Sequence, residues 1–106
     1  MTDTQQVSSV LISIVRALSP IEDDVSREGV ELTRDDNGNL FGDCPWCGAQ
    51  LQVTPGRGLF YCPGCAVSGD VIRWVREAHE VTFLTAVDML ALGLMRKIDE
   101  HRILIA

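Results

Sequence analysis

Two cysteine pairs of identical spacing set the strongest constraint on how this chain folds. The pairs are Cys44 with Cys47 and Cys62 with Cys65, each separated by two residues, and fourteen residues lie between them. Two intervening residues let both sulfurs of a tight turn face one ion, and a hairpin between the pairs brings four thiolates together as a tetrahedron. This pattern predicts a zinc ribbon with one structural Zn²⁺ ion bound by these four cysteines.

The residues around the cysteines agree with a ribbon. Gly48 follows the first pair, Gly64 lies inside the second, and residues 55–58 read Pro-Gly-Arg-Gly. A turn of this composition predicts a hairpin between residues 51–53 and residues 59–61. A second hairpin is expected upstream, where residues 30–33 and 40–41 flank an Asp-Asp-Asn-Gly-Asn turn.

The sequence leaves other uses of the cysteines open. Two structural disulfides or a redox pair would use the same residues, although paired cysteines in a reducing compartment more often bind metal. Iron also accepts four thiolates, and an iron-thiolate electron carrier would be coloured where a zinc protein is not. Four protein ligands leave no position for a reacting water, so the metal is expected to be structural rather than catalytic.

Helical periodicity appears on both flanks of the cysteine region. Before it, apolar residues recur with helical spacing up to Leu18, and Pro20 stops this helix. A short helical turn is expected next, and the acidic pairs at 23–24 and 35–36 are expected to be solvated residues of a cap and a turn. The face of the first helix predicted to pack beneath the ribbon consists of Val7, Val10, Leu11, Ile14, Val15 and Leu18, with Ile12 on its other side.

Two helices are predicted after the cysteines. The first follows the cap cluster Ser68-Gly69-Asp70, and its apolar face is Val71, Ile72, Trp74, Val75 and Ala78. The second begins near Phe83 with Thr82 as its cap, and Phe83, Val87, Leu90, Ala91 and Leu94 are expected to point inward. Residues 98–106 would either add a strand or dock on the core.

These elements predict a small α+β protein. We expect residues 1–106 to form one zinc-ribbon domain of four to five antiparallel strands, with an N-terminal helix and two C-terminal helices. Its parts would be an N-terminal helical segment (1–28), the zinc ribbon (29–67), a helical pair (68–97) and a C-terminal tail (98–106). No apolar run approaches the length of a membrane span and no basic signal region opens the chain, so a cytoplasmic protein is expected.

Acidity distinguishes the first part of the chain. The formal net charge is -6, and residues 1–43 hold nine acidic residues against three basic ones. The later parts of the chain are balanced. A basic tract, the usual footprint of nucleic-acid binding, is therefore absent from the sequence.

Three stretches of the chain carry a more specific signal. They read GDCPWC at 42–47, GLFYCPGCAVSGDVI at 58–72 and VTFLTAVDMLA at 81–91. An aromatic residue precedes the second cysteine pair, a Gly-Asp start opens a helix, and an apolar helix carries Phe-x-x-Ala-Val-x-x-Leu-Ala. This order resembles the N-terminal zinc-binding domain of bacterial and phage DNA primases over residues 7–92.

The resemblance implies a function in DNA replication. In that family the domain is joined to a catalytic domain, assists recognition of the single-stranded template start site and helps deliver a nucleotide for primer initiation. Bacterial members usually have His where this chain has Cys47, whereas some phage members use four cysteines. Family members also tend to carry basic residues in the hairpin before the first cysteine, where this chain has Glu31, Asp35 and Asp36 with only Arg34.

Four residues are predicted to contact single-stranded DNA: Arg34, Trp46, Arg57 and Tyr61. Cations and aromatic faces on one hairpin are the combination that holds single-stranded bases. Strand alternation lets only one of Phe60 and Tyr61 point outward, and we favour Tyr61. Trp46 is either exposed at a turn or a lid over the metal. Arg73 and Arg76 are expected to be solvated charges, with phosphate contact as the alternative.

The sequence thus predicts a non-catalytic, DNA-binding primase module whose partners are single-stranded DNA and a DNA primase catalytic domain or a replicative helicase. Primer synthesis needs several convergent carboxylates to bind magnesium, and the two acidic pairs lie in cap and turn contexts instead, so no catalytic residue is assigned. The alternative is an acidic zinc-ribbon adaptor or inhibitor that binds a basic surface of a replication protein without contacting DNA.

Overall fold

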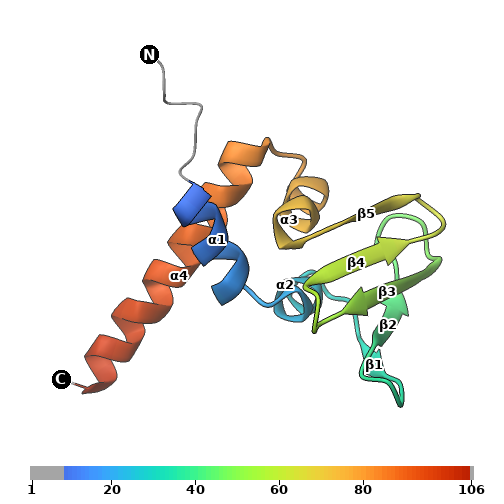
Figure 1. Ribbon diagram of the computed structural model, residues 1–106, viewed down its shortest axis with the longest axis horizontal. Coiled ribbons are helices and arrows are strands. Elements are labelled where there is room, and N and C mark those ends of the chain that lie inside the picture. The colour runs from blue at the N-terminus through green and yellow to red at the C-terminus, as the bar shows by residue number, and fades with distance from the viewer. Residues whose placement is uncertain (1–8, 106) are drawn as a thin grey trace.

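The computed structural model describes the backbone of residues 9–105 and the side chains of residues 9–99. Figure 1 shows an antiparallel sheet on one side of the molecule and helices on the other. The helices are α1 (Ser9–Leu18), α2 (Ile21–Arg27), α3 (Val71–His79) and α4 (Phe83–Ile105). The strands are β1 (Thr33–Arg34), β2 (Leu40–Asp43), β3 (Gln50–Thr54), β4 (Leu59–Cys62) and β5 (Val67–Gly69). This architecture confirms the predicted α+β class.

The sheet is a meander in which each strand pairs with its neighbours in sequence, in the order β1-β2-β3-β4-β5. Both predicted hairpins are present. In the first, the Asp35 carboxylate accepts hydrogen bonds from the backbone N–H groups of Asn37 and Asn39, both at 2.9 Å, and Gly38 has a φ of +86°. An Asp side chain that bonds its own turn is a frequent device for closing such loops. Asp35 is therefore a turn residue, as predicted.

Strand register separates the sheet into an inner and an outer face. Directly opposed residues share a face, because side chains alternate along each strand. One row contains Leu40, Val53 and Phe60, all buried. The next row runs across all five strands on the outer face and consists of Thr33, Phe41, Gln52, Tyr61 and Ser68.

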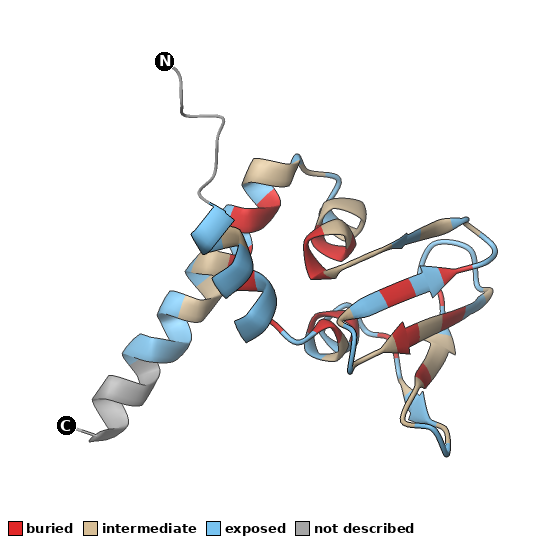
Figure 2. Cartoon of the chain, in the orientation of Figure 1, coloured by how far each residue is buried: buried red, intermediate tan, exposed pale blue. Residues whose placement is uncertain are grey.

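The core lies between the inner face of the sheet and the helices. Trp74 of α3 occupies its centre, with its ring centroid 5.2 Å from that of Phe60 and 4.8 Å from that of Trp46. Four of the five apolar positions predicted for α3 are buried, and Figure 2 shows the buried residues of α3 facing the sheet. On α4, Val87 and Leu90 are buried as predicted, and Thr82 accepts a hydrogen bond from the Thr85 N–H as the expected cap.

The predicted buried face of α1 is largely wrong. Only Val15 of that face is buried, and Ile12, expected on the opposite side, packs partly against the core. The helix lies against α4 rather than beneath the sheet, whose inner face is covered by α3 (Figure 1). This contact is narrow and buries a single row of side chains. The exposed members of the predicted face are Val10, Leu11, Ile14 and Leu18, while Val7 lies outside the described residues.

Asp24 also departs from its prediction. It was expected to be solvated, but it is only 8% exposed on α2, between the buried residues Ile21 and Val25. Burial raises the pKa of the Asp24 carboxyl, and Arg27, followed by Lys97, opposes that rise. The Arg27 guanidinium donates a 2.7 Å hydrogen bond to Asp24. A buried carboxylate generally needs such a partner, which explains why these two residues lie one turn apart.

Residues 98–105 continue α4 instead of forming a strand or a docked tail. The helix is 23 residues long, and among its residues up to 99 the buried ones all lie before Ala91. Figure 2 shows α4 leaving the body of the molecule, where residues 95–99 are exposed. A helix can continue past the core because its backbone hydrogen bonds are internal.

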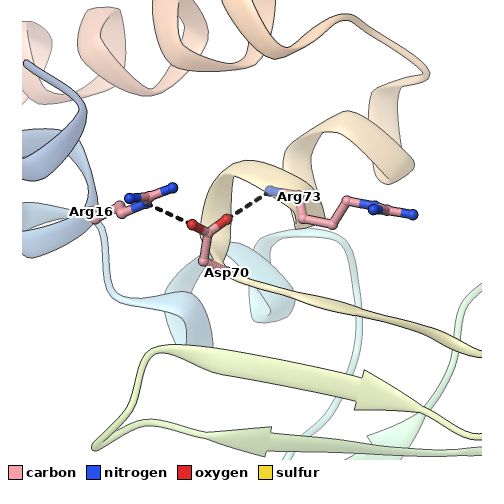
Figure 3. Close-up of polar contacts among 3 residues, drawn as sticks. All are labelled: Arg16, Asp70 and Arg73. Carbon is pink, nitrogen blue, oxygen red and sulfur yellow. Dashed lines mark hydrogen bonds and ion pairs between the residues drawn. The ribbon is translucent and has the colours of Figure 1, made fainter. Parts of the chain in front are cut away.

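Asp70 joins α1 to the start of α3 (Figure 3). One carboxylate oxygen accepts a hydrogen bond from the Arg73 backbone N–H at 3.1 Å, which makes Asp70 the predicted N-cap. The other oxygen accepts a 2.6 Å hydrogen bond from Arg16 Nε. The same carboxylate therefore begins α3 and fixes the position of α1.

Substituting Asp70→Ala is expected to lower the free energy of unfolding by about 1–2 kcal/mol, because a helix cap is lost. Asp70→Asn keeps a capping oxygen and loses only the ion pair to Arg16, whose side chain is 51% exposed. An exposed pair contributes below about 1 kcal/mol, so Asp70→Asn should cost less than Asp70→Ala. Urea denaturation of both variants measures the difference. Equal losses would show that the ion pair, and not the cap, dominates.

Candidate metal centre

The four cysteines lie at one end of the sheet. Cys62 is the last residue of β4, and Cys44 directly follows the last residue of β2. Cys47 and Cys65 lie in the turns that come after these strands. Cys44 and Cys62 are buried, Cys65 is half-buried and Cys47 is exposed, so the centre has one open side.

The four sulfur atoms surround one point. All lie within 4.8 Å of one another, with Cys44 Sγ 3.7 Å from Cys65 Sγ and Cys47 Sγ 3.4 Å from Cys62 Sγ. Thiolates 2.3 Å from a shared zinc ion lie about 3.8 Å apart in a tetrahedron. A disulfide needs sulfurs about 2 Å apart. The geometry therefore fits one zinc ion bound by all four cysteines and excludes disulfides between them.

Special backbone conformations bring the second pair of cysteines against the first. Gly48 and Ala66, which follow the two turns, both have left-handed backbones, with φ of +78° and +58°. Gly64 has no room for a side chain, since a Cβ there would lie 2.6 Å from Cys47 Sγ. A glycine is needed at this position so that the two turns can approach each other closely.

Hydrogen bonds prepare the sulfurs for a cation. The Trp46 N–H donates to Cys44 Sγ and the Cys65 N–H donates to Cys62 Sγ, both at 3.4 Å. Burial acts to raise the pKa of Cys62, but the Cys65 N–H and the neighbouring thiols outweigh it and lower this pKa to about 7. The pKa of Cys65 is raised, first by its hydrogen bond with Cys47 and then by burial. A bound zinc ion would hold all four as thiolates.

Comparison with known proteins agrees with this geometry. The family model described as the CHC2 zinc finger, a DnaG-type zinc ribbon, matches residues 7–103, which include all four cysteines. The chain belongs to the CHC2 zinc-finger family. The family is described as a zinc finger and the four sulfurs fit one ion, so Cys44, Cys47, Cys62 and Cys65 form a zinc site.

Relatives of this CHC2 domain include the DNA primases of two species. The chain is 39% identical over 83 residues to the DNA primase of Streptomyces coelicolor and 34% identical over 89 residues to that of Mycobacterium tuberculosis strain H37Rv. These matches cover 76% and 81% of this chain but only 13% and 14% of the primases. The chain thus spans about a seventh of the length of the curated relatives it matches.

A solved structure shows the same fold. The zinc-binding and RNA polymerase domains of the Aquifex aeolicus primase match with a TM-score of 0.70 and 29% sequence identity over 82% of this chain and 22% of that chain. This CHC2 domain therefore corresponds to a primase zinc-binding domain and not to a catalytic domain. In the part of the chain that the structure describes, every helix is too short or too polar to cross a membrane.

The four residues predicted to contact DNA do not form one surface. Tyr61 lies on the outer face of the sheet and is 48% exposed, whereas Phe60 is buried, as alternation requires. Arg57 is exposed in the turn between β3 and β4. The ring of Trp46 is 38% exposed and packs on Trp74 of the core. Arg34 lies on the edge strand β1.

Arg34 shares a hollow of about 480 Å³ with three acidic residues, Glu31, Asp35 and Asp43. We call this hollow the acidic hollow. Carboxylates around an arginine repel a second anion, so this edge of the sheet is a poor site for a phosphate. The acidic neighbours Glu31 and Asp35 were apparent in the sequence, whereas the presence of Asp43 in the same hollow was not.

Two adjoining hollows occupy the other half of the outer face. One, of about 280 Å³, is lined by Gln52, Thr54 and Tyr61, among others, and the second, of about 360 Å³, by Arg73, Arg76 and Phe83. They share Leu59, Ser68 and Gly69 and are therefore continuous. We call this surface the template face: Gln52, Thr54, Leu59, Tyr61, Ser68, Arg73 and Arg76. The sequence did not predict that α3 places two arginines on a hollow that adjoins the one lined by Tyr61.

Proposed function

We propose that this CHC2 domain is a non-catalytic module of DNA replication that holds single-stranded template on the template face for a primase catalytic domain. The observation that carries the proposal is the position of exposed Tyr61 on a hollow continuous with Arg73 and Arg76. The similarity to DNA primases supports a function in DNA replication. The correspondence to a primase zinc-binding domain supports a module that does not itself catalyse primer synthesis. We place this role in the cytoplasm, where the reducing environment keeps zinc-binding thiols free.

Tyr61 supplies the base-stacking part of this surface. Bases of single-stranded DNA stack on exposed aromatic rings, at about 1–3 kcal/mol per base. The residues opposed to Tyr61 on β3 and β5 are Gln52 and Ser68, both short or polar. These neighbours leave the ring accessible and offer hydrogen bonds to a base edge.

Arginines supply the phosphate contacts. Arg73 is engaged with Glu77 at 2.9 Å, whereas Arg76 lines the hollow without an ion pair to any residue that the structure describes. A guanidinium that is not already paired with a carboxylate favours an acceptor such as a phosphate oxygen. Arg57 lies at the end of β3, where its backbone N–H donates to the Thr54 carbonyl, and it would reach a phosphate at the turn. The acidic hollow at the opposite edge directs the template toward these arginines.

Tyr61→Ala is expected to weaken binding of a single-stranded oligonucleotide about tenfold, because one base stack is lost. Arg76→Gln is expected to weaken binding and to lower the slope of log affinity against log salt by about 0.7, the value for one phosphate on single-stranded DNA. Fluorescence anisotropy of the zinc-loaded protein at several salt concentrations measures both quantities.

Arg34→Gln is the matched control for these variants. It removes the same charge from the acidic hollow, at the far edge of the sheet from α3, and should change affinity little. A loss with Arg34→Gln as large as that with Arg76→Gln would contradict the proposed template face. Failure of the wild-type protein to bind at any salt concentration would contradict DNA binding itself.

The adaptor or inhibitor function is a second candidate, and the acidic hollow favours it. Glu31, Asp35 and Asp43 together offer a negative site to a basic partner surface, including that of a replicative helicase. Because Asp24 is buried, a test by charge neutralisation should use exposed acidic residues. Loss of a co-purifying replication protein from a Glu31→Gln, Asp43→Asn variant, with DNA affinity unchanged, would select this function. An unchanged interaction would count against it.

A further inference from the structure

A groove runs between α2, the end of α3 and the middle of α4, away from the sheet. It encloses about 620 Å³, and we call it the helical groove. Its apolar lining includes Trp74, Val75 and Leu90, together with Met89 and Leu92, which are 36% and 54% exposed. Figure 1 shows that α2 and α3 lie on the sheet side of α4, so the helices themselves form the walls.

Two polar atoms among the groove residues have no hydrogen-bond partner. They are the hydroxyl oxygen of Ser19 and Nε1 of Trp74, and both residues line the groove although they are only 5% and 1% exposed. A buried donor without a partner costs about 1–3 kcal/mol, and native structures seldom leave one unexplained. Both atoms lie beneath the groove surface, so an occupant that carries hydrogen-bond acceptors would satisfy them only where the lining side chains move aside as it binds.

Gly93 leaves a notch in the α4 wall. It lies inside a long helix, where glycine is less favourable than alanine, yet a Cβ at this position would meet nothing within 4 Å. Packing within the chain therefore does not require glycine here. A second backbone that approaches α4 closely would require it, since only glycine has no side chain to hold that backbone away.

The two walls carry opposite unpaired charges. Within the described residues Asp24 is paired with Arg27 and Glu28 with His79, which leaves Asp23 on the α2 wall and Arg96 and Lys97 on the α4 wall without ion pairs. The stretch of α4 from Met89 to Lys97 covers about 12 Å of groove at 1.5 Å per residue. An elongated apolar floor between charged edges is the geometry by which a groove receives an amphipathic helix.

We propose that the helical groove binds an amphipathic helix of a partner protein, with apolar residues on the floor, acidic side chains toward Arg96 and Lys97, and a basic side chain toward Asp23. The close approach of the two backbones occurs at Gly93. This interaction goes beyond the template contact and involves different residues. The test of this interaction does not involve DNA, so its result is independent of the proposed template contact.

Trp74 fluorescence in a Trp46→Phe background tests the proposal with zinc-loaded full chain. The probe is a synthetic helical peptide with leucines along one face, glutamates along one flank and lysines along the other. A second peptide keeps the leucines and carries lysines on both flanks. The first peptide should bind at least tenfold more tightly than the second, because only it complements both walls.

Gly93→Leu serves as the blocking variant. Its side chain enters open space within the groove, so the thermal stability should not fall, while affinity for the first peptide should drop at least tenfold. Gly93→Ala, which adds only one methyl, should weaken binding less. The double variant Arg96→Glu with Lys97→Glu reverses the charge of the α4 wall. It should bind the peptide with lysines on both flanks more tightly than the first peptide, because both walls are then acidic.

Three results would overturn the proposal. They are the absence of binding by the wild-type protein, equal affinity for the two peptides, and full binding by Gly93→Leu. Sedimentation of the protein without peptide measures its oligomeric state and so tests whether a second copy of the chain occupies the groove. If the wild-type protein forms concentration-dependent dimers that Gly93→Leu abolishes, the occupant of the helical groove is a second copy of the chain and not a partner helix. DNA binding by Gly93→Leu should equal that of the wild type, which separates this test from that of the template face.

Discussion

Removing zinc is expected to unfold the sheet and release the helices that pack on it. The four ligands join the ends of β2 and β4, and structural zinc in small domains contributes on the order of 10 kcal/mol. That is as large as the whole stability of a typical domain, about 5–15 kcal/mol, so little stability is expected to remain without the ion. Circular dichroism before and after chelation, followed by stoichiometric zinc, measures the loss and its reversal.

Variants at Cys47 provide the matched control for zinc removal. Cys47→Ser should reproduce the unfolding, because a serine hydroxyl is a poor zinc ligand. Cys47→His should retain zinc, since imidazole is an ordinary ligand and this position is the exposed one of the four. Elemental analysis of each purified variant reports its zinc content. A metal-free protein that still melts cooperatively with the native spectrum would contradict a structural role for the ion.

Trp74→Ala should have the largest effect of any substitution away from the metal. Trp74 is 1% exposed, and its ring meets both Phe60 from the sheet and Trp46 from the first cysteine turn. Replacing a buried tryptophan by alanine costs about 3–5 kcal/mol, because it leaves a cavity and loses its contacts. Urea denaturation of the zinc-loaded protein measures the change in free energy of unfolding.

Trp46→Ala tests whether that cost comes from burial. Trp46 is 38% exposed and contacts the same ring, so its removal opens no enclosed cavity and should cost well under half as much. A loss equal to that of Trp74→Ala would mean that the aromatic contact between the two rings, and not the buried volume, carries the stability.

Local chemistry made the ribbon predictable. The spacing of the cysteines, the Pro-Gly turn before Arg57 and the cap at Asp70 each act within a few residues. Such signals do not depend on the rest of the fold, and the structure confirms them. The orientation of Tyr61 was predictable for the same reason, because alternation along a strand leaves one of two neighbours outside.

The remaining features depend on which elements meet in space. The periodicity of α1 identified an apolar face, but the partner of the helix is α4, and the contact buries Val15 and part of Ile12 instead. Asp24 was predicted to be solvated because no local pattern in the sequence shows that its side chain is buried on α2. The hollow lined by Tyr61 and the hollow lined by the arginines of α3 adjoin each other through the pairing of β4 with β5.

The sheet ends on its shortest strands. β1 has two residues and β5 has three, against four or five in the strands between them. A strand at a sheet edge offers unpaired backbone groups to any other chain, and short edges are one way in which proteins prevent such pairing. The domain can thus keep an open, partly aromatic sheet face in contact with solvent while giving neighbouring molecules little backbone on which to build a fibre.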